Sequence, residues 1–461
     1  MTKQAVPKIY PGKVLIAAVP LIALCVCAPV SPRCETELSA GGGSVRSLTI
    51  KDAIQVAMLN NKSIQIQEEE VAFARSDIMY ARSLFLPQVN AGFGYTLNDA
   101  TLALSQPAAS RKDPGIFSGY KNDNLFDLSL DESIYNGGAN IATLRQAKLQ
   151  LKAQQETLRA ARLEVEFETK RLFYGLLLAY ETRRIAQDLV DQAKAHYEEV
   201  LARFEQGTSS KFDVLQSKTQ VSRLIPQLVN ADNSIDLIMA ELKKLLSINM
   251  SETVRVEGVL SYSPVEIKED DFLHEAYQKN PGMVLKLLGI DINRWAIEFA
   301  KAGWLPQVSA TADYSYRSGD VSDMVNPRHN NWNIGIKATI ALFDGFATKA
   351  KVDEAKARYT QAFLQKEDII EQIAVDIKTA CLDLREAKAI IDAEKDSIDD
   401  AKEALRLSEV RYVNGVGINL DVFDSQVSLA QVEQSLAQGI YDHIMAKAEL
   451  DRTMGREFKG E

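Results

Sequence analysis

One tetrapeptide, Leu-Pro-Gln-Val, occurs twice in this sequence, at residues 86–89 and 305–308. Each copy follows a helical pattern and precedes a run in which apolar and polar residues alternate. Proline has no N–H to donate and disfavours the α conformation in the residue before it. We therefore interpret Pro87 and Pro306 as points where a helix ends and a strand begins, in a chain that makes this transition twice.

The repetition extends through most of the chain. Residues 203–217, RFEQGTSSKFDVLQS, match residues 411–425, RYVNGVGINLDVFDS. A spacing of 208 residues is far longer than the repeats of solenoid proteins, which run to about 50 residues. The pattern predicts two structural repeats, at residues 47–260 and 261–456.

Four segments show the alternation of a strand, in which successive side chains point to opposite faces. They are residues 89–97, 126–131, 308–316 and 332–342. One apolar face along each segment predicts a half-buried strand, and the order of the segments predicts one hairpin in each half. Aromatic residues lie near the strand ends, where membrane strands carry an aromatic girdle. They are Tyr95, Tyr135, Tyr314, Tyr316 and Trp332.

Four strands are too few to close a barrel, and an open sheet edge is not tolerated in lipid. Either the hairpins form a small sheet in water, or several chains combine their strands. Bacterial outer-membrane barrels start at about eight strands, which two chains would supply, while three chains would supply twelve. Strands of about 9–11 residues suit a tilted membrane crossing. This length, the polar alternate face and the export signal described below favour the membrane barrel.

Long helices are the larger feature of the sequence. Residues 347–414 contain neither Gly nor Pro, and residues 139–206 contain only Gly175. At 1.5 Å per residue each run spans about 100 Å, and the sparse, Ala-rich apolar positions are typical of coiled-coil contacts. Shorter helices are predicted at residues 64–84 and 283–304, and helices of about 35 residues after Gly207 and Gly415. Placed end to end, two short helices match one long helix in length.

The N-terminus has the pattern of an export signal. Three lysines precede an apolar stretch at residues 14–30, which Pro20 interrupts. This pattern is typical of a secretory signal peptide, whereas a transmembrane helix needs about 20 apolar residues. We predict a signal peptide at residues 1–27 and a linker at 28–46, with a retained anchor as the alternative.

Several function classes are disfavoured by composition. The net charge of −10 argues against a nucleic-acid partner, because phosphate binding needs a basic surface. Only Cys381 lies beyond the N-terminal segment, so no internal disulfide framework is available. No Walker loop or nucleophile elbow is present. Four histidines lack metal-ligand spacing: His196, His274, His329 and His443. We expect neither enzyme activity nor a cofactor or metal.

The order of these elements resembles that of TolC-type outer-membrane efflux proteins. The resemblance rests on the two Leu-Pro-Gln-Val copies, the turns YNGG (135–138) and LFDG (342–345), and the two matching helix ends, and it covers residues 47–456. It implies a mainly α fold with transmembrane β strands, made of duplicated half-molecules that each contribute a β-hairpin and long coiled-coil helices. Three chains would form a 12-stranded β-barrel in outer-membrane lipid and an α-helical tunnel in the periplasm.

The same resemblance implies a function. The homotrimer would be the passive exit duct of a tripartite efflux or type I secretion system. A periplasmic adaptor (membrane fusion) protein and an inner-membrane transporter would open it. The alternative is a periplasmic coiled-coil adaptor or scaffold protein without a transmembrane pore.

The resemblance also points to residues at the helical turns. Asp421 and Asp424 match family aspartates that form a constriction ring at the periplasmic tip. They are three positions apart and so share one helix face. The alternative role for an aspartate near a helix N-terminus is capping. In the first repeat Asp213 matches Asp421, but Gln216 stands in place of the second acid, so capping does not require both.

A polar latch between neighbouring tip helices is a further family feature. Asp213 and Tyr412 match two of its positions and are the gate candidates. The third position, an arginine in the family, is Gly417 here, so the latch must be built differently or be absent. Gly207 and Gly415 are expected to adopt positive φ in the turns and to contact the adaptor.

Overall fold

The computed structural model describes residues 46–98, 122–319 and 330–457. The chain divides into two units, residues 1–44 and 45–461, and all described residues belong to the second unit. The predicted signal peptide at 1–27 and all but the last residue of the predicted linker lie outside the described residues, as do the N-terminal cysteines and His329.

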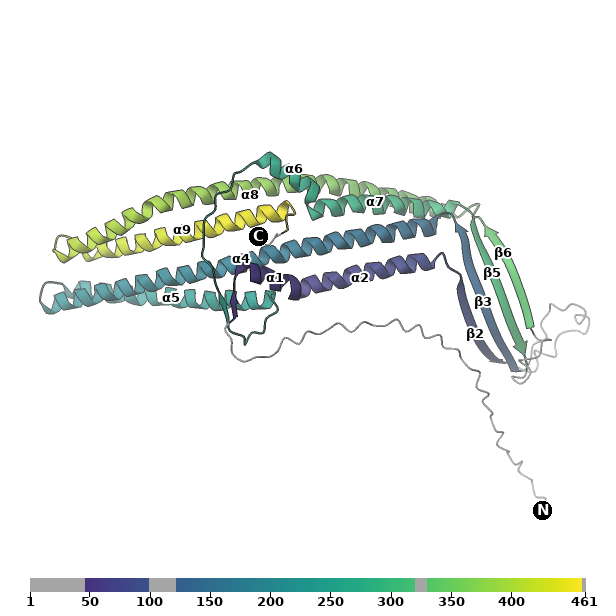
Figure 1. The fold of residues 1–461 in the computed structure, drawn as a ribbon, viewed down its shortest axis with the longest axis horizontal. Coiled ribbons are helices and arrows are strands. Elements are labelled where there is room, and N and C mark those ends of the chain that lie inside the picture. Colours follow the sequence, from purple (N-terminus) through teal and green to yellow (C-terminus); the bar gives the residue numbers. More distant parts are fainter. Residues whose placement is uncertain (1–45, 99–121, 320–329, 458–461) are drawn as a thin grey trace, which may run out of the picture. The chain divides into compact units, whose positions relative to one another are not determined.

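Six helices follow the predicted pattern to within a few residues, and they confirm the duplicated helical architecture. The long ones are α4 (Ala139–Glu205) and α8 (Ala347–Val413), of 67 residues each. The shorter ones are α2 (Lys62–Ser83), α5 (Lys211–Leu245), α7 (Pro281–Lys301) and α9 (Asn419–Thr453). Helix α4 packs along α5, and α8 packs along α9, so each half contains one long helical hairpin. Helix α4 also packs against α7 and α9 and thereby joins the two halves (Figure 1).

Among the helices of the described ranges, none has the length and apolar content that a membrane crossing requires.

In the first half, Asn61 joins the start of α2 to the end of α5. It ends α1 (Ile50–Asn60) and caps α2, where its Oδ1 accepts from the backbone N of Ser63 at 2.8 Å. Its Nδ2 donates to the carbonyl oxygen of Leu245, the last residue of α5, at 2.9 Å. One side chain thus satisfies an unpaired donor of one helix and an unpaired acceptor of the other.

Asn280 makes the same joint in the second half. It follows α6 (Glu269–Lys279) and caps α7, where its Oδ1 accepts from the backbone N of Met283 at 3.1 Å. Its Nδ2 donates to the carbonyl oxygen of Thr453, the last residue of α9, at 2.9 Å. In each half, two short helices therefore form one composite rod beside a long helix, as their lengths predict.

Four strands form one antiparallel sheet in the order β2-β3-β5-β6. They are β2 (Gln88–Leu97), β3 (Asn122–Asn136), β5 (Gln307–Ser318) and β6 (Asn330–Thr339). The two predicted hairpins are confirmed, and β3 and β5 join them.

Two strand boundaries differ from the prediction. Strand β3 covers 15 residues rather than 126–131, because residues 122–125 also pair with β2 and the residues after Asp131 pair with β5. Strand β6 ends at Thr339 rather than Leu342. Thr339 pairs with Gln307, and beyond Gln307 the neighbouring chain is Pro306, which has no N–H to extend the ladder.

The prediction of half-buried strands is wrong for β2 and β6 in the single chain. Every residue of β6, and all but one of β2, is exposed. The apolar side chains share this exposure, as Val89 at 63% and Ile334 at 75% show. Alternation predicts a face that can be buried, but no other element of the described chain covers it.

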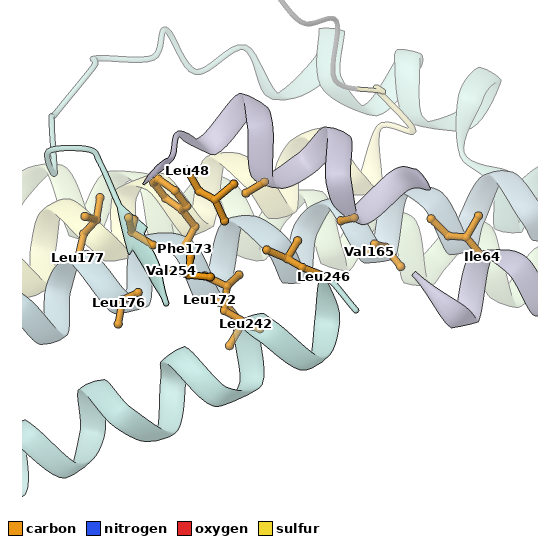
Figure 2. Close-up of a cluster of buried hydrophobic side chains, with 13 residues drawn as sticks. Leu48, Ile64, Val165, Leu172, Phe173, Leu176, Leu177, Leu242, Leu246 and Val254 are labelled. Carbon is orange, nitrogen blue, oxygen red and sulfur yellow. The ribbon is translucent and has the colours of Figure 1, made fainter. Parts of the chain in front are cut away.

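The largest core lies where the N-terminal end of the described chain meets the segment between the halves. Here β1 (Arg46–Leu48) pairs in parallel with β4 (Val254–Val256). Leu48 and Val254 pack with Phe173 of α4 and Leu242 of α5 (Figure 2). Three-residue strands are too short to show a period, so sequence analysis missed this pair.

We predict that Asn280→Ala destabilises the protein. The change removes an N-cap, worth about 1 kcal/mol, and leaves the Thr453 carbonyl oxygen without that partner. The measurement is the midpoint of thermal unfolding, which should fall. Asn230→Ala, at an exposed position inside α5, is the matched control and should change stability by no more than about 0.5 kcal/mol. An unchanged midpoint for Asn280→Ala would contradict a role for the joint.

A second prediction concerns acid stability beside this joint. Glu275 accepts hydrogen bonds from Arg456 at 2.5 Å and Lys279 at 2.8 Å, which lower its pKa from 4.5 to about 2. Because the folded pKa is depressed, this carboxylate stabilises the fold above about pH 4.5 and loses that effect as the pH falls towards 2. The free energy of unfolding of Glu275→Gln should therefore be lower than that of the wild type at neutral pH, and the two values should converge near pH 2.

The control for this experiment is Glu371→Gln, at an exposed position of α8. A difference between Glu275→Gln and wild type that persists unchanged in acid would contradict the assignment.

Candidate functional site at the helical turns

The two turns between helices lie at the end of the helical hairpins opposite the sheet (Figure 1). Gly207 follows α4 with φ of 78°, and Gly415 follows α8 with φ of 73°. These left-handed values strain any residue with a Cβ, so the prediction of positive φ at both turns is confirmed. Contact of these turns with an adaptor stays a prediction.

The first turn contains a complete capping box. Ser210 Oγ donates to Asp213 Oδ2 at 2.7 Å, and Asp213 N donates back to Ser210 Oγ at 3.1 Å. The backbone N of Ser210 also donates to Asp213 Oδ2, at 3.2 Å. Asp213 therefore stabilises the start of α5, independently of any role in a gate.

The second turn is capped much more weakly. Ile418 occupies the N-cap position and offers no side-chain acceptor. Asp421 Oδ2 lies 3.5 Å from the backbone N of Ile418, at the limit of a hydrogen bond. Asp424, one turn along α9, is exposed. Capping accounts for Asp213 far better than for Asp421 or Asp424, whose place in a constriction ring stays a prediction.

Tyr412 and Asp213 lie on different hairpins and close together. Burial raises the pKa of Tyr412, Ser209 lowers it through a hydrogen bond, and the charge of Asp213 raises it further. The guanidinium of Arg203 lies over the Tyr412 ring, 5.4 Å from its centroid. The two gate candidates are thus brought into one cluster, although their function as a latch stays a prediction.

Gly417, the position where the sequence comparison predicts an arginine in related proteins, lies in a tightly packed part of the second turn. Its backbone N donates to the Arg411 carbonyl oxygen at 3.0 Å. A Cβ at this position would lie 3.0 Å from the Tyr412 backbone N and 3.1 Å from Arg411 carbon atoms. A side chain at this position would require the neighbouring backbone to shift by a few tenths of an ångström, because the second turn folds back against the end of α8.

Another arginine contacts Tyr412 from the opposite hairpin. Arg203, near the end of α4, donates from Nη2 to the Val413 carbonyl oxygen at 3.0 Å. Its Nε donates to Glu199 at 3.1 Å, which fixes the side chain along α4. An arginine is therefore present beside Tyr412, but it comes from the first repeat and bonds to a backbone oxygen at the end of α8.

Sequence analysis missed a buried polar pair between α4 and the first residue of α9. His196 of α4 and Asn419 of α9 are 6% and 3% exposed, and His196 Nε2 lies 2.5 Å from Asn419 Oδ1. Asn419 Nδ2 donates to Gln216 Oε1 at 3.3 Å, which leaves its Oδ1 to accept from the histidine. The His196 ring packs edge-on against Tyr412 and Phe423, at 4.9 and 5.2 Å between centroids.

The repeat itself held a signal for this pair. Metal-ligand spacing, which the histidines lack, is no guide to such a contact, and within the described ranges no cluster of His, Cys, Asp and Glu is placed to bind a metal. His196 aligns with Ala404, and Asn419 aligns with Lys211, 208 residues away in each case. Two partners that both change between otherwise similar repeats would have indicated a contact found in one half only.

Comparisons with known proteins agree with this architecture. A family model described as "Outer membrane efflux protein" matches residues 53–247 and 272–456, which fall inside the two predicted repeats. The outer membrane protein TolC of Escherichia coli is 22% identical over 87% of this chain and 81% of its own length. The alkaline protease secretion protein AprF of Pseudomonas aeruginosa is 20% identical over 88% of this chain and 84% of its own.

Solved structures share the fold. The CmeC outer membrane channel of Campylobacter jejuni superposes with a TM-score of 0.78 at 18% identity, over 88% of this chain and 85% of that one. The outer membrane protein VceC of Vibrio cholerae gives 0.76 at 17% identity, over 89% and 97%. At these identities the likeness establishes the fold.

We predict that Gly417→Ala disturbs the second turn. A Cβ that meets backbone atoms at 3.0 Å overpacks the site, which costs about 1–3 kcal/mol. Hydrogen exchange of residues 411–419 should speed up relative to wild type. Gly289→Ala in α7, where a Cβ meets no atom within 4 Å, is the control and should be neutral or stabilising. Unchanged exchange in Gly417→Ala would show that the turn has room for a side chain.

Proposed function

Because this chain belongs to the outer membrane efflux protein family, we propose that it is the trimeric outer-membrane exit duct of a tripartite efflux or type I secretion system. The relatives include both an outer membrane efflux protein and proteins named for protease secretion. In this proposal the duct is passive. An inner-membrane transporter supplies the energy, a periplasmic adaptor docks at the turns around Gly207 and Gly415, and the chain itself catalyses no reaction.

The observation that carries the proposal is the division of the sheet into an apolar and a polar face. In two neighbouring rows that cross all four strands, the paired residues are of one kind. One row consists of Val89, Leu130, Ala312 and Ile334, and the next consists of Asn90, Ser129, Asp313 and Asn333. Successive rows point to opposite faces, so one face suits lipid and the other suits water.

The edges of this sheet support assembly from several chains. Strands β2 and β6 each pair on one side only within the sheet, and unpaired backbone groups are not tolerated in lipid. Three chains placed edge to edge would pair every edge strand and supply the twelve strands that the sequence predicts.

The helical part supports the same assembly. Helix α2 exposes Ile66, Phe73 and Tyr80, at 60%, 66% and 67%, and their spacing of seven residues places them on one face. Such a stripe is typical of a coiled-coil contact. We infer that this face packs against a helix of another subunit in the trimer.

A periplasmic adaptor or scaffold without a pore remains the alternative function. The apolar face of the four-stranded sheet, which no other element of the described chain covers, argues against such a protein, because a scaffold in water would expose this face to solvent. The solubility of a protein with this exposed surface would require a partner or lipid.

The experiment that tests the proposal starts from purified outer membranes. A detergent extract should contain a trimer that dissociates in SDS, and the purified protein should conduct ions across a planar bilayer. A monomer recovered in the soluble periplasmic fraction would contradict the proposal and favour the scaffold.

Asp421 and Asp424 give a sharper prediction for the pore. In a trimer they would place six carboxylates around the tunnel mouth, where a ring of negative charge favours cations. The double change Asp421→Ala with Asp424→Ala should lower the cation selectivity, measured as reversal potential in a salt gradient, and weaken block by divalent cations.

The control for this double change is Asp396→Ala with Asp399→Ala, which removes the same charge from the same three-residue spacing on α8. Equal effects of the two double changes, or no effect of the first, would contradict a constriction at Asp421 and Asp424.

A further inference from the structure

A cavity lies beside the asparagine joint of the first half. It has a volume of about 820 Å³, within the usual range of about 300–1,000 Å³ for small-molecule sites. Its walls come from the start of α2, from α4, and from the end of α5 with the turn that follows it. Three parts of the first repeat thus meet around one space of ligand size, and the function proposed above makes no use of it.

The floor of the cavity is apolar. Leu172, labelled in Figure 2, is 5% exposed and belongs to the largest core, and Leu245 and Ile248 pack against that core. Met250 also lines the cavity and is 56% exposed. A ligand with a hydrocarbon part would cover these side chains and remove apolar surface from water.

Two lysines of the cavity lining have no partner. Within the described ranges, neither the ammonium group of Lys62 nor that of Lys244 makes an ion pair or a hydrogen bond. The two lysines are the chain neighbours of Asn61 and Leu245, which are joined by a hydrogen bond of 2.9 Å. The joint therefore brings two unpaired cations to the same cavity.

The other charges of the lining do not cancel these lysines. Arg171 is already paired with Glu168 at 2.7 Å, and Glu241 is the one acid among the lining residues. In a protein of net charge −10, the lining therefore has a local excess of positive charge. A cleft with charge of one sign attracts ligands of the opposite sign.

Ser247, which also lines the cavity, has a conformation that serine rarely adopts. Its φ of 54° lies in the left-handed region, which strains any residue that has a Cβ. The equivalent residue of the second repeat, 208 positions later, is Gly455 with φ of 69°. Strain of this kind persists where the side chain has a use, and here the use available is a hydroxyl group in the cavity.

The second repeat shows that the joint itself needs no free lysines. Asn280 makes the same joint, yet the equivalents of Lys62 and Lys244 are Pro281 and Arg452. Arg452 is paired with two glutamates, at 2.6 Å each. The two unpaired lysines are therefore a property of the first repeat that the helical joint does not explain.

We propose that this cavity binds a small amphipathic anion, with an acidic head and a short apolar body. The head lies between Lys62 and Lys244 and accepts hydrogen bonds from their ammonium groups and from the Ser247 hydroxyl. The body lies against Leu172 and Ile248. The site is separate from the proposed duct, and binding to it needs no transport.

The position of the cavity favours a soluble ligand over a membrane lipid. The cavity lies at the start of α2, and the 22 residues of this helix extend about 33 Å towards β2. With the sheet in the membrane, an assumption that rests on the proposed function, a lipid head group in the bilayer cannot reach the two lysines.

Calorimetric titration of the full-length protein in phosphatidylcholine nanodiscs tests the proposal. The probe is octanoate, and its partition into lipid is subtracted with empty nanodiscs. Octanoate should bind saturably with one site per chain, and Lys62→Gln with Lys244→Gln should weaken binding at least tenfold. An absence of saturable binding to the wild type would overturn the proposal.

The matched control is Lys148→Gln with Lys152→Gln. These two exposed lysines of α4 also lack an ion pair in the part of the chain that the structure describes, so the control removes the same charge. The affinity for octanoate should stay unchanged. Equal losses in the two double variants would show attraction by overall charge and would overturn the site.

Three further probes separate the charge of the ligand from its apolar part. Octylammonium has the opposite charge and 1-octanol has none, and both should bind at least tenfold more weakly than octanoate. Inorganic phosphate has no apolar part and should also bind more weakly. Equal affinity of octanoate and 1-octanol, or of octanoate and phosphate, would overturn an amphipathic anion as the ligand.

Ser247→Gly separates binding from stability. Glycine relieves the strain at a φ of 54°, so the midpoint of thermal unfolding should not fall, whereas the affinity for octanoate should. Unchanged affinity would overturn the assignment of the hydroxyl group to the site.

Labelling of the wild-type protein reports on the lysines directly. Octanoate should slow the acylation of Lys62 and Lys244 by a soluble reagent, measured by mass spectrometry, and leave Lys148 and Lys152 unaffected. Lys62 and Lys244 that are unreactive before octanoate is added would show that another part of the assembly fills the cavity, and would overturn the proposal. Neither measurement uses conductance, so a protein that binds octanoate but forms no channel would contradict the proposed function alone.

Discussion

The joint made by a single asparagine in each half keeps two short helices in line beside one long helix. Asn61 and Asn280 each bond to the start of one helix and to the end of another, so that two helices separated by about 180 residues of chain stand end to end. These composite rods then match α4 and α8 and carry the register of packing from the turns to the sheet. Without the joints, no side-chain hydrogen bond from Asn61 or Asn280 would hold the ends of the short helices together beside α4 and α8.

A second constraint is that the sheet is unfinished in one chain. Its rows of like residues require lipid on one side and water on the other, and its two edge strands require partners. Duplication supplies these features in pairs, yet the turns show that the halves have diverged. Asp213 is held in a capping box, whereas Asp421 is nearly released from one, and the pair of His196 and Asn419 has no counterpart at the equivalent positions of the other repeat. The asparagine joints and the hairpins of the sheet are repeated in both halves, whereas the differences named here lie at and near the turns.

The sequence predicts the helices well because each of their determinants is local. Gly and Pro mark the ends, and apolar spacing marks the faces, so α4 and α8 are placed to within about a residue of their bounds. Pairing is less local: β6 ends where Pro306 ends its neighbour, and β1 and β4 are too short to show a period. The turns are the least predictable part. The sequence shows Gly417 as a departure, but the crowding around it, and the meeting of His196 with Asn419 across 223 residues, depend on tertiary packing.

The parallel pairing of β1 with β4 has a consequence for the order in which the protein folds. Arg46 pairs with Val254, so the first strand of the described chain has no partner until the whole first repeat has emerged from the translocation machinery. Closing so long a loop is entropically costly and slow compared with forming local helical hairpins. We therefore expect Leu48 to join the core after α4 and α5 have met. A chain truncated before β4 would lack the partner of β1, and the part of the core around Leu48 would stay open.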